Sequence, residues 1–300
     1  MDRAGPKGAV DPSFSQVCRK YKIRLVRSQC PYDAASHVVE PKFPAAADRY
    51  VDLGRFYDVD ALKPLRREVE AHTAACSAAY RRAYRAFRAA EEVEAELREL
   101  VTPGWDQAKL LRRADGILRR ELGKKGGGDG GYTERFLEAR TCRGLICRYD
   151  STLALAPRAY LLLDTWGLGD LLLRHIAQTA ANRGYDAVRC PDPEDPRRLR
   201  HLILPEAGVC FLTETGPFPG KPYRRLHLDA LLLPQRQSRA RLRFGRRMVR
   251  TLQEEGMTAL AQAKESHDRL EAVYHPHVDF GGVTALAQRE WERIEALLDR

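Results

Sequence analysis

A short apolar run, a turn with two glycines and an amphipathic pattern constrain the fold of this chain more than any other feature. The run and the pattern together cover residues 160–181, and the turn between them holds Gly167 and Gly169. This order of strand, glycine loop and helix is that of a phosphate-binding loop, whose backbone amides and helix N-terminus cradle anionic oxygens. The stretch therefore predicts an α/β fold with a potential anion site between a strand and a helix.

The side chains that give such a loop its chemistry are replaced. The functional pattern is G-x-x-x-x-G-K-[ST], in which Lys contacts the β- and γ-phosphates and the hydroxyl binds Mg²⁺. Laid on residues 164–171, the pattern places Asp164 at the first Gly, Asp170 at the Lys and Leu171 at the hydroxyl. This is a degenerate Walker A motif, because a carboxylate repels a triphosphate and leucine cannot hold magnesium. The candidate residues for any surviving binding of ATP with Mg²⁺ are Thr165, Trp166, Gly167, Leu168, Gly169, Asp170, Leu171 and Glu214.

Two interpretations of this loop remain open. Its amides could still accept an anion, with Arg158, Arg174 or His175 supplying positive charge. Alternatively, Asp170 pairs with Arg174 at the i, i+4 spacing of a helix ion pair and takes the anion's place at the helix N-terminus. The second interpretation is favoured, because the side chains that would hold a phosphate and its metal are missing.

Acidic residues follow two other apolar runs. Glu206 and Glu214 come after strand-length segments, and in doubly wound folds the carboxyl ends of the strands face the ligand. Such an acid could coordinate magnesium or orient a water molecule, as in nucleotide hydrolases. Without the hydroxyl partner, a solvated or capping role is the alternative that we favour.

No metal site is predicted from the sequence. Seven cysteines are scattered without a C-x-x-C pair, which speaks against zinc. His275-Pro276-His277 could bind a metal, but a helix-breaking turn explains the proline equally well. We favour the turn.

Composition limits the class of protein. Hydrophobic residues make up 44% of the chain, and no apolar run approaches the roughly 20 residues that cross a bilayer. We therefore expect a cytoplasmic protein without a membrane segment. The net charge of +10 leaves nucleic acid as a possible partner. Its binding would use a stretch with few acids that contains Arg236, Arg239, Arg241, Arg243, Arg246, Arg247 and Arg250.

Periodicity divides the chain into segments. The glycine-rich stretch 123–131 is the clearest linker, so we place a domain boundary there. The predicted parts are a disordered lead-in at 1–16, a first copy at 17–122, the linker at 123–131 and a second domain at 132–300. Helical patterns cover residues 61–100, 106–122, 238–272 and 283–298. Strand patterns cover residues 22–27, 50–54, 185–190, 202–204 and 208–213, with a strand pair at 136–149.

The two halves end alike. At an offset of 173 residues Pro103 meets Pro276 and Asp106 meets Asp279. Each half then has a strand, a long helix, a proline break and a final helix, which predicts an incomplete internal duplication. The first copy lacks the strand and glycine loop that open the second.

These residues resemble the tandem P-loop ATPase-like proteins of Gram-positive, mostly spore-forming bacteria, which are described mainly as hypothetical ATPases. The segments that carry the resemblance are residues 36–44, 53–57, 160–176, 202–206 and 213–217. The resemblance implies two P-loop NTPase-like domains, each followed by a long helical hairpin. This chain departs from that pattern at its first loop, which is absent, and at its second, which lacks its first Gly, its Lys and its Ser/Thr.

The combined expectation is an α/β fold of P-loop NTPase-like type. It has a mostly parallel sheet with helices on both faces, long helical hairpins and an incomplete duplication. The expected function is a degenerate NTPase-like protein that binds nucleotide weakly or serves as a non-catalytic scaffold. The alternatives are an arginine-rich nucleic-acid-binding module and an active ATPase with an atypical phosphate loop.

Overall fold

The structure is a computed structural model that describes residues 51–123, 125, 129–232 and 239–298. It consists of two compact units. One runs from Cys76 to Glu265, and the other combines residues 51–75 with the described residues from Ser266 onward. The predicted linker at 123–131 lies inside the first of these, and separate folding of 132–300 stays a prediction. The predicted lead-in at 1–16 and strand at 22–27 lie outside the described residues.

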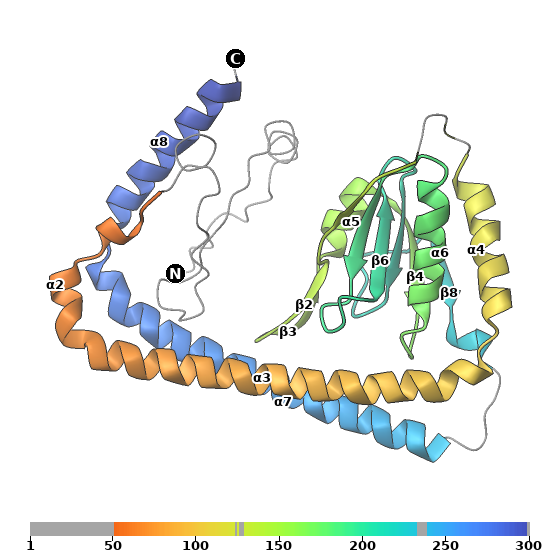
Figure 1. Ribbon diagram of the computed structural model, residues 1–300, viewed down its shortest axis with the longest axis horizontal. Helices are drawn as coiled ribbons and strands as arrows, with labels where there is room; N and C mark the ends of the chain where they lie inside the picture. Colours follow the sequence, from red (N-terminus) through yellow and green to blue (C-terminus); the bar gives the residue numbers. More distant parts are fainter. Residues whose placement is uncertain (1–50, 124, 126–128, 233–238, 299–300) are drawn as a thin grey trace. The chain divides into compact units, whose positions relative to one another are not determined.

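A six-stranded sheet forms the centre of the unit 76–265 (Figure 1). Its strand order is β1-β5-β6-β7-β4-β8, and only β6 runs opposite to the others. The strands are β1 (Tyr132–Glu134), β4 (Arg158–Leu163), β5 (Ala187–Pro191), β6 (Leu199–Leu204), β7 (Val209–Thr213) and β8 (Arg224–His227). The central strands β4 and β7 are apolar and buried, as expected for strands covered on both faces. The prediction of a mostly parallel sheet is confirmed.

Helices cover both faces of this sheet (Figure 1). On one face, α4 (Gln107–Glu121) and α6 (Gly169–Ala181) pack against the even-numbered side chains of β4, including Tyr160 and Leu162. On the other face, α5 (Tyr149–Leu155) and the hairpin of β2 (Glu138–Thr141) and β3 (Gly144–Cys147) cover Leu161 and its neighbours. The predicted strand pair at 136–149 is this hairpin. The two faces differ because side chains alternate along a strand.

The two long helices are α3 (Arg66–Val101) and α7 (Arg239–Tyr274). Each has buried residues at heptad spacing. In the unit 76–265, small residues of α3 lie against small residues of α7, so the two backbones approach closely. The buried positions are Cys76, Ala79, Ala83, Ala86 and Ala90 on α3, and Gly256, Ala259 and Ala263 on α7. This alternation of three- and four-residue steps is the pattern of a coiled coil.

Tyr80, Tyr84 and Phe87 recur at i, i+4 and i+7, a spacing that predicts a packed aromatic seam on α3, but the structure does not form one. Phe87 is buried against α7, but Tyr80 and Tyr84 are 39% and 61% exposed and stack on each other. The heptad positions, three or four residues apart, carry small side chains, and the two tyrosines lie beside that seam. The prediction was therefore wrong for these two residues.

In the other unit, short turns join the ends of the long helices. Its elements are η1 (Gly54–Phe56), α2 (Val59–Leu62), η2 (Lys63–Leu65), η5 (His275–His277) and α8 (Phe280–Leu298), with the adjoining ends of α3 and α7. Tyr57 pairs with Val278, and Val69 packs against Leu270 and Tyr274. The predicted strand at 50–54 is wrong for its described residues, because Val51–Leu53 form no strand and Gly54 begins a 3-10 turn.

Secondary structure repeats at the offset found in the sequence. Helices α3 and α7 have matching bounds at an offset of 173 residues, and so do η3 (Thr102–Gly104) and η5. Both final helices are preceded by a capping aspartate, since Asp106 accepts from Lys109 N at 2.8 Å and Asp279 accepts from Gly282 N at 2.8 Å. The His275-Pro276-His277 segment is thus a helix-breaking turn, as favoured from the sequence. A shared origin of the two halves stays a prediction.

The predicted helices at 61–100, 106–122, 238–272 and 283–298 correspond to α3, α4, α7 and α8. In the part of the chain that the structure describes, none of the helices combines the length and the apolar character that crossing a bilayer requires.

Candidate functional site

The candidate anion loop joins the carboxyl end of β4 to the first residue of α6, as predicted. It comprises Asp164 to Leu168, and Gly169 is the first helical residue. The carboxylate of Asp164 turns back into the loop and accepts the amide N–H of Leu168 at 2.8 Å and of Gly169 at 2.7 Å. These amides are the ones that a phosphate would use at the helix N-terminus. The protein's own carboxylate occupies them.

Burial and hydrogen bonding act on Asp164 in opposite directions. Loss of water around the carboxylate raises its pKa, and the amides of Leu168 and Gly169 lower it by favouring the charged form. Burial is the larger effect, so the pKa of Asp164 lies above its usual value. The neighbouring Asp229 adds to this rise. Asp164 therefore holds the loop at a cost in desolvation, and an added anion would meet a loop whose amides are already occupied.

The other loop residues are also held by the protein. The amide of Thr165 donates to Asp229 Oδ1 at 3.1 Å, and its hydroxyl donates to the same carboxylate. Gly167 has a φ of +68°, a conformation that favours glycine, and its carbonyl accepts from Arg198. The indole of Trp166 lies under the Arg246 guanidinium, 5.3 Å from the ring centroid. Little of the loop is left for a ligand.

Asp170 makes the helix ion pair that its spacing predicts. Its carboxylate accepts from Arg174 Nε at 2.9 Å and from the amide of Leu199 at 2.6 Å. The prediction that Asp170 itself takes the anion's place is wrong in detail, because Asp164 fills that position. Leu171 packs against the core of the sheet and Leu168 is buried beside it. These leucines are packing residues in this structure.

Two of the cations proposed for the loop lie elsewhere. Arg158 begins β4, at the opposite end of that strand, where it donates to the carbonyl of Ala207 at 2.7 Å and pairs with Glu121. His175 Nε2 lies 2.7 Å from Asp115 Oδ1. His175 stands almost two turns beyond the start of α6, and its side chain therefore lies away from the loop. Assigning these two to the loop was therefore wrong.

The two strand-end acids are separated by the direction of β6. Glu214 follows β7 at the carboxyl edge, as expected, but it is exposed and pairs with Arg225 at 3.2 Å. Glu206 lies in the β6–β7 turn at the opposite edge and pairs with Lys125. A turn with Gly208 at φ +62° makes β6 antiparallel to β7, so the residue after β6 lies at the opposite edge. The prediction that Glu206 lies at the same edge of the sheet as Glu214 was therefore wrong.

Side chains at the carboxyl edge enclose a cavity of about 260 Å³. It lies between the loop, the start of β6 and the facing parts of α3 and α7. Its four carboxylates and five guanidinium groups are almost balanced in charge. They belong to Glu94, Asp164, Asp170 and Asp192, and to Arg98, Arg198, Arg200, Arg246 and Arg250. A triphosphate site would instead need a clear excess of positive charge.

Several residues of this edge were missed by sequence reasoning. Asp192 follows β5 and Asp229 comes shortly after β8. Both could have been found by the argument used for Glu214, that an acid after a parallel strand lies at the carboxyl edge of the sheet. Arg198 and Arg200 belong to the edge only because β6 starts there, and no local signal distinguishes them.

Three carboxylates meet beside this cavity: Glu91 and Glu94, one turn apart on α3, and Glu194 from a distant segment. Burial, together with the negative charges of Glu194 and Glu91, raises the pKa of Glu94 to about 7. Each acid already has a partner, since Arg98 pairs with Glu91, Gln253 donates to Glu94 at 2.9 Å and Arg140 pairs with Glu194. These partners make the cluster an internal polar network, so the trio is not an open cation site.

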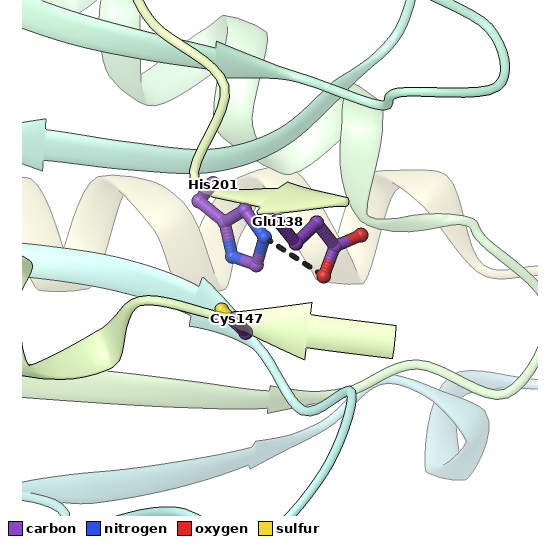
Figure 2. Close-up of side chains that lie close together, drawn as sticks. All are labelled: Glu138, Cys147 and His201. Carbon is purple, nitrogen blue, oxygen red and sulfur yellow. Dashed lines mark ion pairs between the residues drawn. The ribbon is translucent and has the colours of Figure 1, made fainter. Parts of the chain in front are cut away.

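Glu138, Cys147 and His201 form a second cluster, in the layer covered by β2 and β3 (Figure 2). Figure 2 shows the His201 ring facing the Glu138 carboxylate, with the Cys147 sulfur nearby. His201 Nε2 lies 3.4 Å from Glu138 Oε2, and Arg200 pairs with the same carboxylate. A glutamate, a cysteine and a histidine are donors that zinc accepts, so the arrangement has to be tested against that metal.

The hydrogen bonding of His201 argues against a metal. Its Nδ1 accepts the buried amide N–H of Thr213 at 3.1 Å, so the proton of the neutral ring is on Nε2 and faces Glu138. A metal at Nε2 would require that proton on Nδ1, against the Thr213 amide. Burial lowers the pKa of His201 and outweighs Glu138, which favours the neutral ring. The cluster fits an internal polar contact better than a zinc site.

The pKa of Glu138 reflects the same surroundings. Burial alone would raise it, but His201 and the Arg200 charge outweigh burial and lower the pKa to about 2. Glu138 is therefore a charged group at neutral pH, held by its neighbours. No position in the sequence pattern had pointed to it.

The segment predicted to bind nucleic acid lies on α7, and some of its arginines already contact other residues of the chain. Arg241 makes a two-pronged contact with Glu96 at 2.5 and 2.6 Å, and Arg246 covers Trp166. Arg239, Arg243, Arg247 and Arg250 are exposed, and Arg236 lies outside the described residues. Binding of nucleic acid through this segment stays a prediction.

No protein family model, no curated protein and no solved structure matches this chain.

Proposed function

We propose that this chain is a non-catalytic scaffold of P-loop NTPase-like type, in which the phosphate loop has become a structural turn. The observation that carries the proposal is the Asp164 carboxylate on the amides of Leu168 and Gly169, at 2.8 and 2.7 Å. A bound phosphate and this carboxylate need the same two donors. A nucleotide would therefore have to displace a side chain of the protein before it could bind.

Three further features support the absence of catalysis. Phosphoryl transfer depends on positive groups that neutralise the phosphates and on a metal held in place. The residue after Gly169 is Asp170, whose carboxylate is bound to Arg174 and to the amide of Leu199. The next residue, Leu171, packs into the core, and the cavity beside the loop carries nearly balanced charge.

The scaffold part of the proposal rests on the long helices. The seam of α3 against α7 has coiled-coil spacing and small residues on both sides, so it holds two helices of 36 residues each. The matching bounds of α3 and α7 support an internal duplication as the origin of this pair. A long helix pair of this kind is suited to positioning other proteins.

Nucleotide binding provides the test. We expect no rise in melting temperature with ATP or GTP and Mg²⁺, whereas a bound ligand at 100 times its dissociation constant adds roughly 2.7 kcal/mol. We also expect ATP hydrolysis no faster than in a heat-inactivated sample. Sustained turnover that is lost in Gly169→Pro and kept in Arg243→Gln would contradict the proposal.

A restored loop tests the same reasoning in the other direction. The triple variant Asp164→Gly, Asp170→Lys, Leu171→Thr frees the two amides and returns the ammonium and the hydroxyl. Isothermal titration of this variant, confirmed folded by circular dichroism, should give measurable binding of ATP with Mg²⁺. If it does not bind at millimolar nucleotide, the loop is only a strand-to-helix turn.

A further inference from the structure

A second recess differs sharply in charge from the cavity at the loop. It is a groove of about 520 Å³ between α4 and the edge strand β8, with Tyr160 of β4 in its floor. The lining residues are Arg113, Gly116, Ile117, Arg120, Tyr160, Arg224, Arg225 and Leu226. Four of these are arginines and none is acidic. The groove therefore carries concentrated positive charge, whereas the charges that line the cavity at the loop nearly balance.

Two of the four guanidinium groups have no acidic neighbour in the described part of the chain. Arg120 lies beside Glu121 at 3.0 Å and donates to the Tyr160 hydroxyl, and Arg225 pairs with Glu214 at 3.2 Å. Neither Arg113 nor Arg224 has an ion pair there, and both are exposed. One stands on α4 and the other on β8. An anion in the groove would thus be contacted from two elements.

An exposed aromatic ring stands beside these arginines. Tyr223 immediately precedes β8, is 44% exposed, and meets the Tyr160 ring edge-on at 5.4 Å. The guanidinium groups of Arg224 and Arg158 lie 5.4 and 5.9 Å from its centroid. An aromatic platform next to a cationic groove is the combination by which proteins hold single-stranded nucleic acid, with phosphates on the cations and a base stacked on the ring.

We propose that the groove between α4 and β8 binds a single-stranded segment of RNA or DNA. Arg113 and Arg224 contact backbone phosphates, and Tyr223 stacks on a base. The volume suits one or two nucleotides, which excludes the side-on entry of a duplex. An acidic peptide would use the same cations but would gain little from the exposed ring. This assignment is separate from the loop, so it stands whether or not the loop binds nucleotide.

Two variant pairs with equal charge change provide the test. The probe is a fluorescein-labelled 12-nucleotide oligo(dT), titrated with the full chain and followed by fluorescence anisotropy at several salt concentrations. Arg113→Gln with Arg224→Gln should weaken binding roughly 10- to 100-fold, because two charge-assisted contacts are lost. The slope of log K against log salt should fall by about 1.4. The control pair is Arg143→Gln with Arg148→Gln, two exposed arginines beside the β2–β3 hairpin on the opposite face of the sheet, and it should bind like the wild type.

The aromatic residue is tested separately. Tyr223→Ala should weaken binding about fivefold or more, and Tyr223→Phe should retain it, because a stacked base needs the ring and not the hydroxyl. Circular dichroism and melting temperature confirm that each variant is folded.

Other outcomes overturn the proposal. An equal loss in the groove pair and in the control pair would mean that net charge alone attracts the oligonucleotide. A loss only in a third pair, Arg243→Gln with Arg247→Gln, would place the site on α7. Competition by a poly-glutamate peptide as effective as unlabelled oligo(dT) would point to an acidic protein segment. Equal competition by millimolar inorganic phosphate would reduce the groove to a simple anion site. Absence of oligonucleotide binding by the wild type would remove the assignment altogether.

Discussion

Removing the Asp164 carboxylate tests whether the loop holds itself together. In Asp164→Ala the amides of Leu168 and Gly169 lose the carboxylate oxygens that accept their hydrogen bonds, at N–O distances of 2.8 and 2.7 Å. Both residues are buried, and each unsatisfied amide costs about 1–3 kcal/mol. Part of this cost is recovered, since burial raises the pKa of Asp164 and the variant no longer buries a charged carboxylate. We therefore expect a net loss of about 2 kcal/mol, at the upper end for a helix N-cap.

The assay is thermal and urea unfolding at pH 7. A loss of about 2 kcal/mol lowers the melting temperature of a unit of this size by roughly 4–8 °C. Asp60→Ala is the control, because its carboxylate is exposed and pairs with Lys63 at the surface. A surface pair of this kind contributes about 0–1 kcal/mol.

Adding an anion distinguishes loss of the Asp164 hydrogen bonds from a simple loss of side-chain packing in Asp164→Ala. The two freed amides at the start of α6 should accept sulfate, so sulfate should restore part of the stability of Asp164→Ala. A site with a dissociation constant of about 10 mM would gain roughly 1.4 kcal/mol at 100 mM sulfate. Wild type should show no such gain over sodium chloride of matched ionic strength. Equal stabilisation of both proteins, or an unchanged unfolding free energy in the variant, would refute the argument.

Two further predictions concern the helix seam and the buried carboxylates. Gly256→Ala should destabilise the fold by about 1–3 kcal/mol, because its Cβ would lie 2.3 Å from the Phe87 ring. Gly116→Ala on α4 would meet only the end of the Arg119 side chain, at 4.0 Å, and should stabilise by about 0.5–1 kcal/mol. Urea unfolding compares the two variants, and equal effects would contradict this packing. Stability should also depend on pH in two opposite ways. Glu138, with a folded pKa of about 2, contributes stability above its unfolded value near 4.5 that is lost as the pH falls towards 2. Glu94, with a folded pKa of about 7, contributes stability below pH 4.5 that is lost as the pH rises through 7. Replacing either residue by Gln should remove its own dependence from unfolding curves measured between pH 3 and 8, and an unchanged curve in either variant would show that the residue does not titrate as described.

The sequence by itself determined those features that depend on neighbours along the chain. The long helices follow from an apolar period sustained over 36 residues, and the Asp170–Arg174 pair follows from helical spacing. The order of strand, glycine loop and helix could be predicted because each part has its own local signature. The repeated proline turns, at Pro103 and Pro276, were equally visible.

Only the tertiary structure decided what occupies the loop. In the sequence Asp164 was merely a lost glycine, and its role depends on a side-chain rotation that places it on amides four and five residues later. The bond from Thr165 to Asp229 joins residues 64 positions apart. Hydrophobic pattern does not encode strand direction, so the antiparallel course of β6 and the resulting position of Glu206 could not be foreseen.

The arginine groove shows the same division most clearly. Arg113 and Arg224 each occupy unremarkable exposed positions, one on a helix with mixed charges and the other at the start of a short strand. They face one recess because β8 pairs with β4, and because α4 packs its apolar side onto the same face of the sheet. Hydrophobic burial determines that packing without reference to charge. The convergence of the exposed cations is therefore a property of the folded chain, and local sequence carries no signal for it.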